Sequence, residues 1–151
     1  MASDYPVLMP VPSARSAVRM PLEESVRYAI TNPEAKYEWL WTASIGDGQV
    51  RLGPRYQYFS LVMEHEQRCM RWLRMGLAME KARPLEGHVR HCLNFLRQHA
   101  LCGGDNTLEP ADALARNHSV QRWDVEHRCR DWEALYEALH ANWVEWEGVV
   151  R

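Results

Sequence analysis

The sequence predicts a mainly α-helical protein: a small single domain with a central helical hairpin, a Trp-rich C-terminal helix and a few short strands. Three segments carry this prediction. Residues 58–81 and 84–101 each repeat apolar side chains at a helical period, and only a short link separates them. From Asp131 onward a third segment places its aromatic and leucine side chains on one side of a helix. A chain of 151 residues is one domain by size.

The segments before the hairpin are predicted to be short. Residues 1–20 contain three prolines and no continuous apolar run, so we expect an extended N-terminal arm, with the domain over 21–151. Pro21 is expected to open a short helix over 21–30. Asn32 should cap a second short helix that has Pro33 at its first position.

Glycine and proline mark the remaining boundaries. Residues 44–56 hold three glycines and one proline around a brief alternating segment, which predicts a turn, a short strand and another turn. Pro84 should start the second hairpin helix, and Gly103 with Gly104 should end it. Residues 105–130 are expected to form a loop with little regular structure, apart from a possible strand over 119–125. Asp131 should cap the last helix, whose predicted core side is Trp132, Leu135, Tyr136, Leu139, Trp143 and Trp146.

Composition excludes several classes of function. Lys and Arg total 18 against 20 Asp and Glu, with no basic stripe, so nucleic acid is not an expected partner. The longest apolar run is far shorter than the roughly 20 residues of a membrane span, and we expect a soluble chain. No Gly-rich phosphate loop, nucleophile elbow or paired-cysteine zinc motif is present. Seven tryptophans and six tyrosines suit a packed core or a pocket for an apolar small molecule.

Four cysteines, Cys69, Cys92, Cys102 and Cys129, allow three pairings if all are oxidised. Cys92 and Cys102 would lie about 15 Å apart along one helix, beyond the roughly 7 Å Cα limit of a disulfide. Each would then have to pair with Cys69 or Cys129. Four free thiols are the alternative.

The histidines indicate a metal site. His88 and His91 are three residues apart in "HVRHC", so both rings leave the same side of a helix. His65 in "HEQRC" repeats this layout, with Cys69 one turn later and Arg68 in place of the second histidine. Three imidazoles with an open position suit copper, zinc or iron. In the alternative interpretation, these histidines are surface residues or hydrogen-bonded core residues that bind no metal.

The predicted hairpin sets a geometric condition on this site. If the chain turns near residue 82, His65 lies level with about residue 99, and therefore about 13 Å along the axis from His91. A shared site therefore requires helices that cross steeply, or a first helix that ends early.

Two further residues are candidates for proton transfer. Asp105 in "CGGDNTLEP" suits a general base or a turn residue that accepts local amides. His127 in "HRCRDW" suits either a functional role or a loop histidine bonded to the backbone.

Taken together, the segments "YFSLVMEHEQRC", "HVRHCLNFLRQHALCGGDNTLEP" and "HRCRDWEALYEAL" resemble the UstYa-like family of fungal secondary-metabolite (mycotoxin) biosynthesis proteins. The resemblance runs from about Pro21 to Trp146. Its most specific part is the middle segment, in which a histidine pair and a cysteine are followed by Leu-Arg-Gln and then Cys-x-x-Asp.

The resemblance implies an oxidoreductase that tailors a small natural product, with copper as the expected metal. It implies His65, His88 and His91 as metal ligands and two disulfides among the four cysteines. Oxidised cysteines would in turn suggest the lumen of the secretory pathway. Our predicted catalytic residues are Arg68, His91, Asp105 and His127, with Arg68 positioning the substrate. The sequence does not decide whether the protein forms a homo-oligomer.

Two alternatives are compatible with the same residues. In the first, the protein is a metal-free cyclase, dehydratase or isomerase: His88 or His91 moves a proton, and the Arg68 guanidinium stabilises a developing anion. In the second, the protein is a non-catalytic binding or partner subunit.

Overall fold

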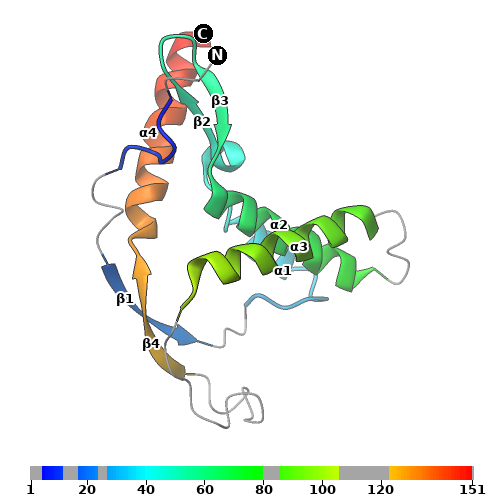
Figure 1. Ribbon diagram of the computed structural model, residues 1–151. Helices are drawn as coiled ribbons and strands as arrows, with labels where there is room; N and C mark the ends of the chain where they lie inside the picture. The colour runs from blue at the N-terminus through cyan, green and yellow to red at the C-terminus, as the bar shows by residue number, and fades with distance from the viewer. Residues whose placement is uncertain (1–4, 12–16, 24–26, 80–85, 106–122, 151) are drawn as a thin grey trace.

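The computed structural model describes residues 5–11, 17–23, 27–79, 86–105 and 123–150 (Figure 1). Within these ranges the fold is mainly α-helical with a few short strands, as predicted. The elements are β1 (Ala17–Glu23), α1 (Ala35–Leu40), the 3-10 turn η2 (Ile45–Gly48), β2 (Gln49–Leu52), β3 (Gln57–Ser60), α2 (Val62–Ala78), α3 (Glu86–Gly103), β4 (Trp123–Arg130) and α4 (Trp132–Val150). None of the described helices has the length and apolar character needed to cross a membrane.

The predicted hairpin is formed by α2 and α3, which pack against each other. In the view of Figure 1, α3 passes in front of α2 and the two helices cross. Gly76 permits their close approach, because a Cβ there would lie 2.9 Å from Val89 Cγ2. The first helix is shorter than predicted at both ends: residues 57–60 form β3, and the helix ends at Ala78.

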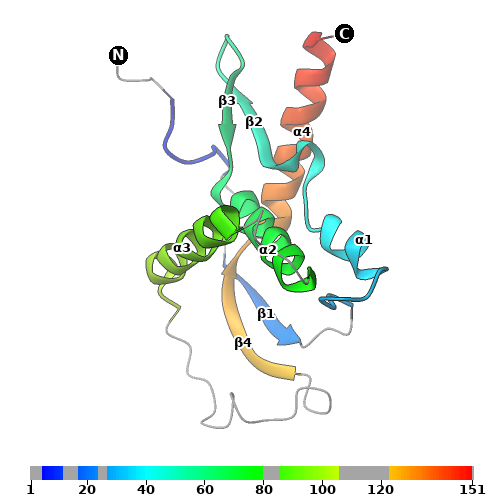
Figure 2. The ribbon, with the colours of Figure 1, turned by 90° about the vertical axis from the view of Figure 1, so that its right-hand side faces the viewer.

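A long antiparallel ribbon, β1 with β4, lies at one end of the molecule (Figure 2). Its register places Met20 opposite His127 and Pro21 opposite Glu126. The helix expected over 21–30 is therefore wrong throughout its described residues, because 21–23 lie in β1 and 27–30 are not helical. The loop expected over 105–130 is wrong for 126–130, whereas residues 123–125 of the expected strand do lie in a strand, β4. Pro21 is tolerated because β1 has a single neighbour, so one edge needs no backbone donors. Most of the strand expected over 119–125 lies outside the described residues.

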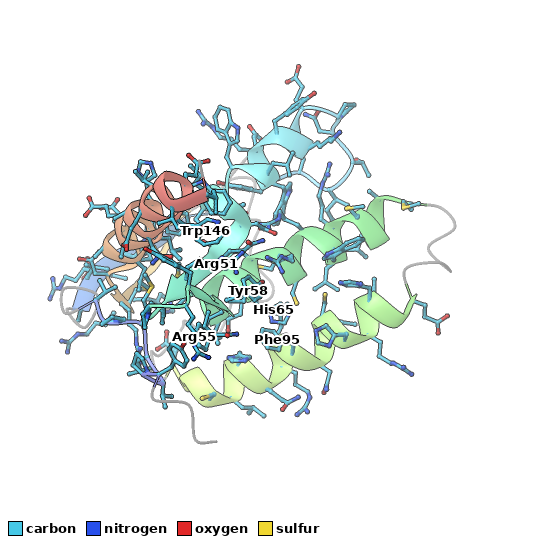
Figure 3. All side chains as sticks on the ribbon, turned by 90° about the horizontal axis from the view of Figure 1, so that it is seen from above. Arg51, Arg55, Tyr58, His65, Phe95 and Trp146 are labelled. Atoms are coloured by element: carbon cyan, nitrogen blue, oxygen red, sulfur yellow. The ribbon has the colours of Figure 1, made fainter. Side chains whose placement is uncertain are left out.

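The second sheet is the β2–β3 hairpin, which packs against α4. Asn142 of α4 ties the two together, accepting from the Arg51 backbone N–H (2.8 Å) and donating to its carbonyl (2.7 Å). The Arg51 guanidinium lies over the rings of Tyr58 and Trp146, 4.7 and 5.1 Å from their centroids (Figure 3). The turn, strand and turn predicted for residues 44–56 are confirmed.

The predicted cap of the last helix is present, whereas α1 begins later than predicted, with Glu34 rather than Asn32 at its N-cap position. Asp131 caps α4 by accepting from the Ala134 N–H (3.0 Å), and Asn32 accepts from the Glu34 N–H (2.9 Å) just before α1. Leu139 is the fully buried residue of α4, whereas Trp132 is 42% exposed.

A buried carboxylate connects η2 to α2. Glu64 has no exposed surface and accepts from the Ser44 backbone N–H (3.2 Å). Burial, with Glu64 as the next cause, raises the pKa of Tyr136 to about 12. The Tyr136 hydroxyl in turn donates to the Thr42 carbonyl. The segment before β2 is thereby held between α2 and α4, on the side of α2 opposite α3.

Candidate metal centre

His65 and His91 meet across the α2–α3 seam. Their Nε2 atoms are 3.5 Å apart, and their ring centroids are 5.5 Å apart with the planes 26° from parallel. Figure 3 shows His65 and Phe95 pointing toward one another between the two helices, and their centroids are 4.0 Å apart. The crossing of α2 and α3, with the early end of α2 at Ala78, meets the geometric condition set by the sequence.

Cys69 offers a third donor atom at the same place. The donor atoms of His65, Cys69 and His91 all lie within 4.8 Å of one another. Cys69 is buried, and its pKa is raised to about 12 by that burial and then by the hydrogen bond and charge of neighbouring Cys92. Because the thiolate is the form that binds a metal, the protonated Cys69 thiol is a poor ligand as it stands.

His88 lies beside this group without joining it. Its ring stacks on Trp72 with centroids 4.4 Å apart, and it stands edge-on to His91 at 6.3 Å. Of the three predicted imidazole ligands, the structure brings two into direct contact and holds the third one turn away on α3.

The surroundings of His65 favour its neutral form. Its pKa is lowered by burial, and further by His91, Arg68, His99 and His88. A neutral imidazole has a free lone pair on one nitrogen and can bind a cation without first losing a proton.

The spacing of the two nitrogens fits a metal ion. Two ligands at about 2.0–2.1 Å from a tetrahedral metal lie roughly 3.3–3.4 Å apart, close to the 3.5 Å between the two Nε2 atoms. Imidazole nitrogen is a donor that copper, zinc and iron all accept. The donor set and its spacing therefore suit a tetrahedral first-row metal ion, and they do not choose among copper, zinc and iron.

Arg68 faces the other side of α2. Its Nε donates to Asp47 Oδ2 (2.8 Å) and its Nη2 to the Asp47 carbonyl (2.6 Å), while Arg71 pairs with Asp47 Oδ1. Consecutive helical residues are about 100° apart around the axis, so Arg68 turns toward η2 while Cys69 turns toward α3. A substrate-positioning role for Arg68 stays a prediction.

The two candidates for proton transfer lie together. His127 Nδ1 is 2.6 Å from Asp105 Oδ2, and the His127 side chain is 12% exposed. Its Nε2 is buried and has no hydrogen-bond partner among the described residues. The sequence offered both residues separately, because 22 positions separate them and no spacing rule links a strand residue to a helix end.

All four cysteines are free thiols in this structure. Cys69 contacts Cys92 across the helix seam, and both are buried. Cys102 and Cys129 line one cavity. As predicted, Cys92 and Cys102 share one helix.

Sequence reasoning missed a polar pair next to the histidines. His99 Nδ1 of α3 lies 3.3 Å from Glu66 Oε1 of α2. The Phe95 ring separates it from His65, with centroids 4.2 Å from His99 and 4.0 Å from His65. The signal was present on α3, where His91, Phe95, His99 and Cys102 recur every three or four residues and so share one face.

The fold and site define a small helical domain with an imidazole-rich helix seam. The family described as mycotoxin biosynthesis protein UstYa matches residues 40–147, and the chain belongs to this family. No solved structure matches it significantly.

Three fungal relatives illustrate the similarity. The UstYa family oxidase phomYb of Diaporthe leptostromiformis is 36% identical over 76 residues, 48% of this chain and 30% of the relative. The oxidase ustYa of Aspergillus flavus is 32% identical over 85 residues, 54% of this chain and 38% of the relative. The UstYa family oxidase phomYd of Diaporthe leptostromiformis is 29% identical over 130 residues, 74% of this chain and 38% of the relative. The chain thus matches only about a third of the length of these relatives, from 30% to 38%.

Proposed function

We propose that this protein is a copper-dependent oxidase that tailors a small natural product in fungal secondary metabolism. The relatives named as oxidases support the reaction class. The observation that best supports a bound metal is the 3.5 Å separation of the His65 and His91 Nε2 atoms. When bound, copper would supply the one-electron chemistry that amino-acid side chains lack.

His65 and His91 would hold the ion, with His88 as the third imidazole. The lowered pKa of His65 keeps its nitrogen available at neutral pH. Trp72 supports the His88 ring from one face, and Phe95 covers the opposite end of the site against His65. These aromatic contacts would orient the imidazoles around a bound ion.

We assign the four cysteines to two disulfides, Cys69–Cys92 and Cys102–Cys129. The first pair is in contact at the buried seam. The second would join the end of α3 to β4, where the Asp105–His127 contact already brings the two elements together. Pairing Cys69 with Cys92 leaves an all-imidazole site, and oxidised cysteines favour a secretory-pathway location.

The Asp105–His127 pair favours a second candidate, a metal-free cyclase, dehydratase or isomerase. A carboxylate on Nδ1 fixes the tautomer of the imidazole and leaves Nε2 as a base. In His127 that Nε2 has no partner among the described residues. Arg68 contributes less to this alternative, because Asp47 occupies two of its donor nitrogens.

Dioxygen uptake and metal dependence separate the two reactions. A substrate would be sought by incubating the copper-loaded protein with extracts of fungal metabolites and following new masses. An oxidase consumes dioxygen, requires copper, and loses both product and copper in His91→Ala. A metal-free enzyme forms its product in the presence of a chelator and loses it in His127→Ala. Product formation that survives metal removal would contradict the copper proposal.

A further inference from the structure

A cavity of about 620 Å³ lies beside the histidine seam. It is bounded by the described part of the N-terminal arm, the β2–β3 hairpin, the ends of α2 and α3, and the junction of β4 with α4. Its walls include Val50, Phe59, Leu61, Met63, Trp132 and Leu135. Cavities of roughly 300–1,000 Å³ with apolar walls are the usual sites for small organic molecules.

The cavity has a polar end. Besides Ser60, Arg130 and the two cysteine thiols, the polar side chains in the wall are Glu66 and His99. These two pair through His99 Nδ1 and Glu66 Oε1, 3.3 Å apart, and each side chain is about 30% exposed. A carboxylate on Nδ1 selects the tautomer that carries the proton there, so Nε2 is left as a hydrogen-bond acceptor.

This polar end adjoins the candidate metal centre. The Phe95 ring contacts His99 on one side and His65 on the other, with centroid distances of 4.2 and 4.0 Å. A molecule bound against His99 would therefore lie one aromatic ring from His65.

We propose that this cavity is the substrate pocket of the oxidase, and that it takes an apolar molecule carrying a hydroxyl group that donates to His99 Nε2. The inference rests on the proposed function. The apolar walls hold the body of the substrate, and the Glu66–His99 pair selects its polar group. If the hydroxyl proton transfers to His99, the substrate oxygen keeps the electron pair and Glu66 balances the imidazolium charge.

Two matched probes test the pocket. 2-Naphthol has an apolar body and one hydroxyl, and 2-methoxynaphthalene has nearly the same shape without the donor proton. We expect the protein to bind 2-naphthol about 5- to 10-fold more tightly, the worth of one hydrogen bond. His99→Leu should abolish this preference and leave the affinity for 2-methoxynaphthalene within about twofold. His140→Leu, an exposed histidine of α4, is the control and should keep the preference.

Copper binding is measured on the same samples, so that the two proposals fail separately. Copper bound without a preference for 2-naphthol overturns the pocket assignment and leaves the metal site standing. A His99-dependent preference in a protein that retains no copper supports the pocket and overturns the oxidase. Equal affinities in the unaltered protein, or binding of neither probe, overturn the pocket even if His99→Leu does not fold.

Discussion

Arg68 donates from Nε and Nη2 to Asp47, on the side of α2 that faces away from α3. In the family pattern that this chain resembles, position 68 is a histidine, as His91 is in "HVRHC". Here the long guanidinium instead anchors the 3-10 turn, where Asp47 holds a positive φ of 53°. The same carboxylate also pairs with Arg71. Position 68 therefore connects η2 to α2, whereas positions 65 and 69 face the candidate metal centre.

Arg68→Ala should destabilise the protein without removing copper. Arg68 is 30% exposed and Asp47 is 44% exposed, so solvent screens the pair and we expect a loss of about 1 kcal/mol in the free energy of unfolding. Urea denaturation measures this change, and copper content after desalting measures metal binding. A folded Arg68→Ala protein that cannot retain copper would show that Arg68 acts on the metal site.

Gly48→Ala should destabilise far more. Gly48 has a φ of +75°, and a Cβ there would lie 2.2 Å from the Cβ of buried Glu64. Overpacking and backbone strain together predict a loss of about 2–4 kcal/mol. Gly87→Ala is the matched control, because nothing lies within 4 Å of its added Cβ and it sits in a helix. It should be neutral or stabilising by up to about 1 kcal/mol. Equal melting temperatures for the two variants would contradict the packing of η2 on α2.

Stability of the metal-free protein should fall in mild acid. The pKa of His65 is lowered in the folded state, so the unfolded chain takes up its proton first, near pH 6.5. The contribution of His65 to the free energy of unfolding is therefore fully present above about pH 6.5. It is lost as the pH falls through the lowered folded-state pKa. His65→Gln should flatten this dependence in denaturation curves between roughly pH 7.5 and 5. An unchanged acid dependence in His65→Gln would refute the assignment.

The cysteine pairing predicts that the protein has no free thiol under denaturing, non-reducing conditions. Peptide mapping should recover Cys69 linked to Cys92 and Cys102 linked to Cys129. Loops of this length predict about 3.5 kcal/mol of stabilisation for each disulfide by the chain-entropy estimate. Four titratable thiols, or a cross-link between Cys69 and Cys129, would contradict the pairing. A thiolate-to-copper absorption band would instead make Cys69 a ligand.

The helices were predictable because their signals are local. Apolar periodicity, Asn32, Asp131 and Gly103 act within a few residues of the elements they define. The β1–β4 ribbon was missed because it joins segments about a hundred residues apart, and because a proline stands in β1. Strand pairing over such a distance leaves no local pattern.

The site was predictable in part. The repeated motifs identified His65 and His91 as candidate ligands. Only the crossing of α2 and α3 in the structure places their Nε2 atoms 3.5 Å apart. The Glu66–His99 pair was missed because its members lie on different helices, 33 positions apart (99 minus 66). Such a contact depends on helix register, which periodicity alone does not give.

The central claim is that His65 and His91 hold one copper ion. The direct measurement is copper content after loading and desalting, with electron paramagnetic resonance of the same sample, for the unaltered protein, His91→Ala and His140→Leu. We expect one equivalent of copper with coupling to imidazole nitrogen in the unaltered protein and in His140→Leu, and loss of that signal in His91→Ala. Absence of retained copper in the unaltered protein, or an unchanged signal in His91→Ala, would contradict it.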